Sequence, residues 1–463
     1  MSRLLKIFIF VFSLFCVAVI CLFLWVNSLV RSPQAISSLQ EFAVTYLKAD
    51  IEFQSIKANI LDGFNLNHVL VTRSQEIPTK EVVGTKLEID KLKVRYALLP
   101  LFLKTIKLSN VELLRPNLNI IQQDDGSWDM PNLDPSLQLL SKPSVQLFGQ
   151  RFAFALDRLK LRHGEFIATH RDDWTILNIK GADVEGRFHE VPQKSDALGK
   201  LHFDELVIAH TLSMQHLRAP IHADHGKLIL PQWHALSHEG NAKGSASLDF
   251  SAEPALYEIF MSLTDVNLSH MMTTFGENSS SFLSGLLNLE VDLEGDLSQI
   301  SAITGTGNLE IRDASFSQLP GLQLLSNLLN LDHLADTTYE KVKGSFKIED
   351  QKLTFYDLQA PDEQIRFTGS GYLSFDNQLN FEIRLAISPE MAERIPKEFA
   401  TNFKHHPDGY RTLLFTLSGD LQNPKTNLDK KLAIDSSVLA TDIQDFQSRR
   451  EPSAASLDPE TIP

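Results

Sequence analysis

Apolar and polar residues alternate one by one over much of this chain, and this period of two restricts the fold more than any other feature. The clearest stretch is Tyr96–Met130, where Ile106 and Leu108, then Val111 and Leu113, are separated by polar residues. Successive side chains of a β-strand point to opposite faces, so each run has one apolar and one polar face. The pattern therefore predicts a mainly β protein.

Turn-forming residues interrupt these runs. We interpret Ser109-Asn110 and Pro116-Asn117 as the ends of short strands, and Asp125-Gly126 as a tight turn at which the chain doubles back. Comparable runs continue through residues 152–250, where glycine or proline recurs at short intervals. This region is expected to form a long series of hairpins.

Two later runs show the alternation most regularly, one from Leu287 to Leu293 and one from Phe381 to Leu385. Such an apolar stripe either fills a closed core or lines an open groove, and both interpretations are kept. The candidate groove-lining residues are Ile106, Leu108, Leu287, Leu289, Val291, Leu293, Phe381, Ile383 and Leu385.

A few short segments break the strand pattern. Leucines in Gly321–Leu334 have helical spacing. Ser388-Pro389-Glu390 is typical of a helix start, and Pro396 should end that helix soon afterwards. Residues 31–50 are expected to form an amphipathic helix, and residues 436–463 a mobile acidic tail.

Residues Ile7–Val26 are twenty consecutive residues without a charge, enough for a helix to cross a hydrocarbon core of about 30 Å. We predict one transmembrane helix within residues 1–30, with the amino terminus inside and the bulk of the chain outside. A cleavable signal peptide is disfavoured, because its apolar region covers only about 7–15 residues and ends in small residues. The candidate anchor residues are Ile7, Phe12, Val17, Leu22 and Trp25.

Charge and cysteine content exclude several classes of protein. The formal net charge is −15, which opposes a general affinity for nucleic-acid phosphates. Both cysteines, Cys16 and Cys21, lie within the expected span, so the rest of the chain forms no disulfide and depends on burial for its stability.

Sequence motifs for catalysis are missing. The chain contains no HExxH, GxSxG or P-loop pattern and no complete dinucleotide-binding glycine motif. Glycine pairs such as Gly305/Gly307 and Gly369/Gly371 are interpreted as bulges or close backbone contacts. We therefore expect neither an enzyme nor a cofactor.

Histidines are concentrated in one region, and they are His202, His210, His216, His222, His225, His234 and His238. The spacings His222-x-x-His225 and His234-x-x-x-His238 could supply metal ligands, but no cysteine accompanies them. We interpret these histidines as parts of polar strand faces and predict no metal site.

Short motifs, taken in order, resemble one known family. The opening strands contain Phe53, Ile56, Gly63 and Val69 within Asp50–Val71. The motifs that follow are Leu99-Pro100-Leu101, Arg115-Pro116, Asp125-Gly126-Ser127-Trp128, His225–Leu230 with Gly240, Gly244 and Leu248-Asp249, Gly295-Asp296-Leu297, Gly305-Thr306-Gly307, Gly369-Ser370-Gly371, Leu417-Ser418-Gly419-Asp420 and Asn423-Pro424. These motifs follow one expected amino-terminal span. Their order resembles that found in the AsmA-like family (AsmA/TamB/YhdP type), which consists of inner-membrane-anchored envelope proteins of Gram-negative bacteria.

The resemblance implies an elongated, curled β-sheet whose concave apolar groove holds lipid acyl chains. The expected domains are an amino-terminal β-groove over residues 51–264 and a carboxyl-terminal β-groove with short helices over residues 265–435. It also implies a single-pass inner-membrane protein with a cytoplasmic amino terminus and a periplasmic bulk.

We consider two functions for this protein. The first is binding and transfer of phospholipid toward the outer membrane, with a periplasmic or outer-membrane protein as a further candidate partner. The second is a scaffold for outer-membrane protein assembly, which would act by pairing at a sheet edge. Copurifying lipid discriminates between them.

The topology is tested with a reporter fused after Pro463. We expect the reporter to be active in the periplasm and silent in the cytoplasm, because the apolar run is followed by a chain that must be translocated. Cytoplasmic activity would contradict both the orientation and the compartment.

Overall fold

The computed structural model describes most of the region from residue 49 to residue 428. The described residues are 49–59, 63–73, 86–97, 100, 103–122, 128–129, 144–147, 150–170, 175–191, 194–208, 212–224, 227–249, 251–252, 254–273, 283–296, 303–316, 326, 329, 331, 337–420 and 425–428. This part of the chain is mainly β, with 80% in strands, as the alternating pattern predicts.

Three predicted segments lie outside the described residues. They are the membrane span, the tail, and residues 31–48 of the helix predicted over residues 31–50. None of the helices that the structure describes is long and apolar enough to cross a membrane.

The chain forms two compact units. Unit 1 takes in residues up to Asn267 together with Asn288–Thr306, and unit 2 takes in Leu268–Leu287 and the residues from Gly307 onward. The strands β15 (Leu283–Asp296) and β16 (Thr304–Phe316) are each divided between the two.

Most strands of unit 1 are long. They are β1 (Ala49–Asn59), β2 (Gly63–Arg73), β3 (Lys86–Ala97), β4 (Thr105–Gln122), β5 (Trp128–Asp129), β6 (Ser144–Leu147), β7 (Gln150–Leu156), β8 (Arg158–His170), β9 (Thr175–Val191), β10 (Lys194–Ile208), β11 (Leu212–Asp224), β12 (Lys227–Ser237), β13 (Gly240–Asp249) and β14 (Leu256–Asn267).

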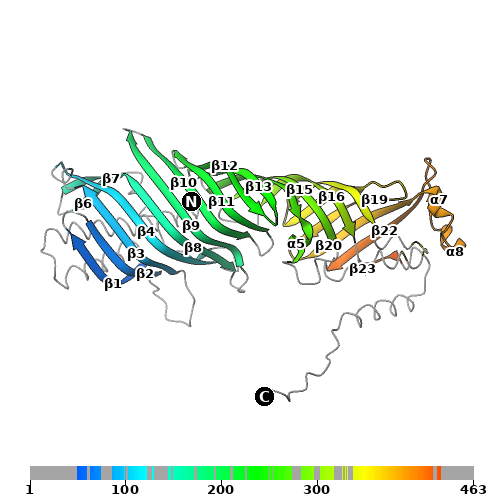
Figure 1. Ribbon diagram of the computed structural model, residues 1–463, viewed down its shortest axis with the longest axis horizontal. Helices are drawn as coiled ribbons and strands as arrows, with labels where there is room; N and C mark the ends of the chain where they lie inside the picture. The colour runs from blue at the N-terminus through cyan, green and yellow to red at the C-terminus, as the bar shows by residue number, and fades with distance from the viewer. Residues whose placement is uncertain are drawn as a thin grey trace, which may run out of the picture. The chain divides into compact units, whose positions relative to one another are not determined.

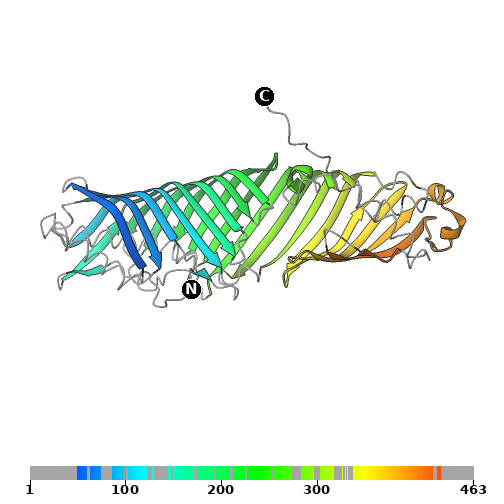
Figure 2. The ribbon, with the colours of Figure 1, turned by 90° about the horizontal axis from the view of Figure 1, so that it is seen from below.

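Neighbouring strands of unit 1 pair to form one curved sheet (Figures 1 and 2). Strands β1 to β4 pair antiparallel in sequence order, and so do strands β8 to β14. Strands β4 and β8 join these two runs by parallel pairing. Among the described strands β1 pairs with β2 alone, so the sheet has an edge there and is not closed.

The series of hairpins predicted for residues 152–250 is present in strands β8 to β14, whereas the parallel pair that joins β8 to β4 was not predicted from the sequence. A parallel connection needs a dozen or more residues between its strands, and residues 123–157 provide them. Within this connection β7 also pairs parallel to β4, while β6 pairs antiparallel to β7.

The stretch Tyr96–Met130 folds differently from the expectation of several short strands. Residues Thr105–Gln122 form one continuous 18-residue strand, with Ser109-Asn110 and Pro116-Asn117 in its interior. The interpretation of these pairs as strand ends is therefore wrong. The chain does double back after Gln122, because β5 pairs antiparallel with the end of β4.

At these interior residues the alternation of inward-facing and outward-facing side chains is interrupted. Along β4, buried positions are two apart except between Leu108 and Val111 and between Leu113 and Pro116, where they are three apart. Arg115 has a positive φ of 48°. A strand can thus absorb turn-forming residues by a local twist instead of a reversal.

The step of three recurs in seven strands of unit 1. It lies at one level in β2, β3, β4 and β8, and one inward-facing pair further along in β9, β10 and β11, because Gly164 stands opposite Ala182 and Phe166 opposite Ile179. The inward-facing pairs that flank it are Leu66/Val69, Ile89/Leu92, Leu113/Pro116, Leu161/Gly164, Ile179/Ala182, Phe203/Leu206 and Met214/Leu217. We call this interruption the phase step, because two consecutive residues of each strand face outward there.

Backbone geometry and register explain how the phase step is tolerated. Positive φ angles occur at His68, Arg115, His163, Gly181 and His216, which all lie at the phase step of their strands. The pairing of β2 with β3, β3 with β4 and β10 with β11 keeps the same register on both sides of it. Between β8 and β9 the register shifts on both sides of Gly164, and this offset keeps the apolar side chains of all seven strands on one face.

The strands of unit 2 from residue 338 onward form a second antiparallel arrangement. They are β17 (Thr338–Glu349), β18 (Lys352–Ala360), β19 (Ile365–Ser374), β20 (Gln378–Ile387), β21 (Lys404–His405), β22 (Arg411–Asp420) and β23 (Lys425–Thr426). The order of pairing is β17–β18–β19–β20–β22–β23, and β21 pairs with β22.

Three short helices are described: α5 (Leu268–Met272), α7 (Pro389–Ala392) and α8 (Lys397–Ala400). The Ser388 hydroxyl accepts a hydrogen bond from the Met391 N–H at 3.3 Å and so caps α7. The helix predicted to begin at Ser388-Pro389-Glu390 is confirmed. It ends at Ala392, before Pro396, and Pro396 directly precedes the next helix.

The glycine pair of β19 allows close approach to β20. A Cβ built on Gly371 would lie 2.6 Å from the Cα of Phe381. A Cβ on Gly369 would lie 3.3 Å from the Glu382 carbonyl oxygen, its nearest neighbour. The close backbone contact predicted for this pair is present at Gly371.

We expect Gly371→Ala to lower the free energy of unfolding by about 1–3 kcal/mol, because the added methyl group overlaps neighbouring backbone. Gly369→Ala, two residues away on the same strand, is the matched control and should cost less. Thermal unfolding followed by circular dichroism checks both, and equal losses would contradict the close-approach argument.

Candidate functional site

The apolar face of unit 1 is the candidate functional site. Its side chains form rows in which each residue stands directly opposite the next across the sheet. The first row runs through strands β2, β3, β4, β8, β9, β10 and β11 as Leu66, Leu92, Leu113, Leu161, Val184, Leu201 and Ala219.

A second row crosses the same strands on the other side of the phase step. It consists of Val71, Leu87, Leu118, Phe166, Ile179, Leu206 and Met214. Seven strands at a spacing of about 4.8 Å make each row about 29 Å long. The two rows together form a continuous apolar strip across this part of the sheet.

Exposure changes along the strip. In the first row Leu66 is 7% exposed and Leu92 and Leu113 are each 1% exposed. The next three residues of that row, Leu161, Val184 and Leu201, are only half-buried. The protein covers the strip fully at β2–β4 and partly at β8–β10, so the latter strands offer apolar surface to a ligand.

One of the two predicted residues in β4, Leu108, lies on this face. Leu108 is fully buried at 0% exposure and stands opposite Tyr96 of β3. The backbone of Ile106 pairs with Phe154 of β7. Leu108 is therefore a core residue at the well-covered end of the strip.

The predicted residues in β15 alternate between two degrees of burial. Leu287 and Val291 are buried, at 7% and 4% exposure, while Leu289 and Leu293 are half-buried. A Cβ on Gly305 would lie 2.8 Å from the Leu293 side chain, so this glycine leaves room for a leucine on the neighbouring strand.

The predicted residues in β20 meet a closed core at one end. Leu385 is 0% exposed and belongs to a cluster with Met391 of α7 and Phe403. Ile383 is half-buried and packs against this cluster, and Phe381 lies 5.9 Å from the Phe355 ring across Gly371. For Leu385, the closed-core interpretation fits the structure better than a groove.

Tyr257 brings a polar atom to the apolar face. Its side chain is 6% exposed, and within the described part of the chain its hydroxyl has no hydrogen-bond partner. Burial, with a smaller effect from Asp296, raises the pKa of Tyr257 to about 12. The ring therefore stays neutral and acts as apolar surface.

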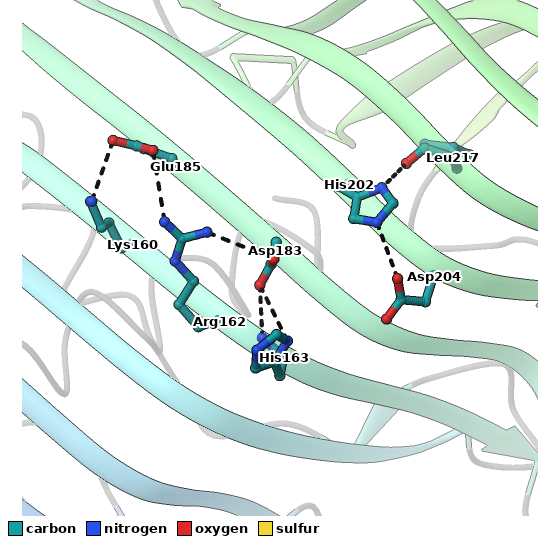
Figure 3. A network of polar contacts seen from close by, with 8 residues as sticks. All are labelled: Lys160, Arg162, His163, Asp183, Glu185, His202, Asp204 and Leu217. Atoms are coloured by element: carbon teal, nitrogen blue, oxygen red, sulfur yellow. Dashed lines mark hydrogen bonds and ion pairs between the residues drawn. The ribbon is translucent and has the colours of Figure 1, made fainter.

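The opposite face of β8–β10 is held by charge pairs, several of which are drawn in Figure 3. Lys160 lies 3.6 Å from Glu185, Arg162 lies 3.7 Å from Asp183, and the His163 backbone N–H donates to Asp183 at 2.9 Å. Exposed pairs of this kind stabilise weakly. They keep this face in water and leave the other face for apolar contacts.

Two groups of residues were missed by sequence reasoning. One is the half-buried strip of β8–β10, and the other is the set of outward pairs at the phase step, such as Arg162-His163 and Asp204-Glu205. The available signal was an apolar spacing of three, flanking two consecutive polar residues, inside an otherwise alternating run.

We expect Leu385→Ala to lower the free energy of unfolding by about 2–5 kcal/mol, because it leaves a cavity in a closed core. Leu414→Ala is the matched control, since Leu414 is 38% exposed on the paired strand β22, and it should change stability by less than about 0.5 kcal/mol. Thermal unfolding checks both. A Leu385→Ala protein as stable as its parent would place Leu385 outside the core.

Comparison of the chain with protein-family models, with curated proteins and with solved structures finds no match in any of the three.

Proposed function

We propose that this protein is an inner-membrane-anchored periplasmic lipid-binding protein of the AsmA-like type, which passes phospholipid toward the outer membrane. The observation that carries the proposal is the strip on the apolar face of unit 1, fully covered at β2–β4 but only half-buried at β8–β10. An apolar surface of this kind stays in contact with water unless a ligand covers it.

Dimensions are compatible with an acyl chain as that ligand. The half-buried part of the strip at β8–β10 spans about 10 Å, which is most of the length of an acyl chain, since the acyl layer of one membrane leaflet is about 15 Å thick. A chain lying along a row would contact successive leucine, valine and isoleucine side chains. Each buried methylene contributes about 0.8 kcal/mol, so binding needs no specific polar contact.

The anchor and the polar face fit the same function. The uncharged run Ile7–Val26 would hold the sheet close to a source of lipid. The ion pairs of β8–β10, including Lys180 with Glu205 at 2.9 Å, lie on the opposite face. Lipid headgroups would remain at the margin of the strip, in contact with water.

The scaffold function has one observation in its favour, which is the edge of β1. Within the described strands β1 pairs only with β2, and an unpaired edge can template another strand. This function predicts no bound lipid.

The decisive variant is Leu201→Asp, which places a charge in the first row at its half-buried part. We expect lipid that copurifies with the full-length protein, quantified by mass spectrometry, to fall strongly while the thermal unfolding temperature changes little. Water reaches the new charge when lipid is absent, but a bound acyl chain would exclude it.

Two variants control this experiment. Leu198→Asp makes the same change on the same strand at a residue that is 54% exposed, and it should keep the lipid. Val94→Asp, at a residue 1% exposed on β3, should destabilise the fold by several kcal/mol. Absence of lipid from the parent, or undiminished lipid in Leu201→Asp, would refute the proposal.

A further inference from the structure

The phase step brings three metal-ligand side chains together on the polar face of unit 1. They are His202 and Asp204 of β10 and His216 of β11, whose ligand atoms all lie within 4.8 Å of one another. Asp204 and His216 stand opposite each other at the phase step, since the flanking pairs are Phe203 with Leu217 and Glu205 with Gln215. The sequence interpretation had assigned these histidines to an ordinary polar strand face.

Both ring nitrogens of His202 face oxygen atoms. Its Nδ1 lies 3.1 Å from the Leu217 carbonyl oxygen, and its Nε2 lies 3.1 Å from a carboxylate oxygen of Asp204 (Figure 3). Both neighbours can only accept, whereas a neutral imidazole has a single N–H to donate. An imidazolium satisfies both contacts with its two N–H groups, whereas a neutral ring that donates Nδ1–H to the carbonyl directs the lone pair of Nε2 at the carboxylate and is suited to share a cation with it.

This is the arrangement that metal-binding histidines use. A backbone carbonyl that accepts from one ring nitrogen fixes the tautomer and directs the other nitrogen at the metal. His216 adds a second imidazole, because its ring is stacked on that of His202 with the centroids 6.4 Å apart and the planes 7° from parallel. His216 takes this position with a positive φ of 55°.

The neighbouring strand leaves room for the carboxylate. Gly181 of β9 has a φ of 63°, and a Cβ built there would lie 2.7 Å from the Cβ of Asp204. Any larger residue would displace Asp204 from its place beside His202. Three strands thus contribute to the position of these side chains.

We propose that His202, Asp204 and His216 bind a divalent transition-metal ion, with zinc as the best fit. Two imidazoles and one carboxylate are zinc ligands, and a tetrahedral zinc with bonds of about 2.0–2.2 Å holds its ligands about 3.3–3.6 Å apart. Small side-chain rotations bring the present separations to these values. The side chains of His202 and Asp204 are 29% and 60% exposed, so an ion enters from water, and water completes the coordination.

The bound ion would clamp β10 to β11 directly beside the half-buried part of the apolar strip. It lies on the opposite face from the row that contains Leu201 and Ala219. The site does not depend on the proposed lipid function, because its residues do not contact the apolar face.

The test uses the full-length protein, purified in detergent without a histidine tag and stripped with a chelator. Zinc is added in competition with a chromophoric chelator, and bound zinc is counted by mass spectrometry. We expect the parent to bind one zinc ion more per chain than the His202→Asn/His216→Asn double variant. Each of His202→Asn, Asp204→Asn and His216→Asn should weaken binding at this site at least tenfold.

His222→Asn and His234→Asn are the matched controls, because His222 is exposed on β11 and His234 on the adjacent strand β12, and both lie outside the cluster. They should leave the affinity unchanged. X-ray absorption at the zinc edge of the parent should show two imidazole ligands. Equal zinc binding by the double variant, or an equal loss in either control, would overturn the proposal, whatever the lipid content of the protein.

Discussion

Each strand of unit 1 must keep its apolar side chains on the same face as its neighbours, and the rest of the sheet depends on this constraint. If one strand changed phase alone, some of its leucine and valine side chains would point into the solvent. The seven strands from β2 to β11 instead change phase in step, with an offset of one inward-facing pair between β8 and β9. Positive φ angles occur there at residues such as Arg115 and Gly181, and the register is continuous in pairs such as β3–β4. The result is an apolar strip that runs unbroken across both halves of the sheet.

The same step shapes the polar face. Wherever two consecutive residues point outward, the polar side chains become locally twice as dense, and opposite charges from adjacent strands meet. Arg115 and Asp90 form an ion pair at 2.6 Å there, and Lys180 pairs with Glu205 at 2.9 Å. The group of His202, Asp204 and His216 belongs to this step as well. One backbone device therefore connects the candidate lipid surface on one face with the candidate metal site on the other.

The two units handle their apolar faces differently. In unit 2, α7 and α8 supply Met391, Ala392 and Phe399 to a core that encloses Leu385 and Phe415, so that part is stabilised as an ordinary closed core. In unit 1, Leu161, Val184 and Leu201 remain half-buried. Apolar area left partly exposed contributes less to folding than it could and remains available for binding. This difference separates residues that support the fold from residues that could hold a ligand.

Local chemistry in the sequence was sufficient to predict the β class, the helix start at Ser388 and the close approach at Gly371, because each depends on residues near in sequence. It did not predict that β4 is one strand, since turn-forming residues are also compatible with the phase step. The parallel pairing of β4 with β8, the burial of Leu385 and the meeting of His202 with His216 depend on which strands become neighbours. Strand pairing depends on residues far apart in the sequence. Alternation predicts which side chains share a face, but it does not predict which residues lie opposite them or what covers them. Only the tertiary structure decided the partners and the cover of each strand.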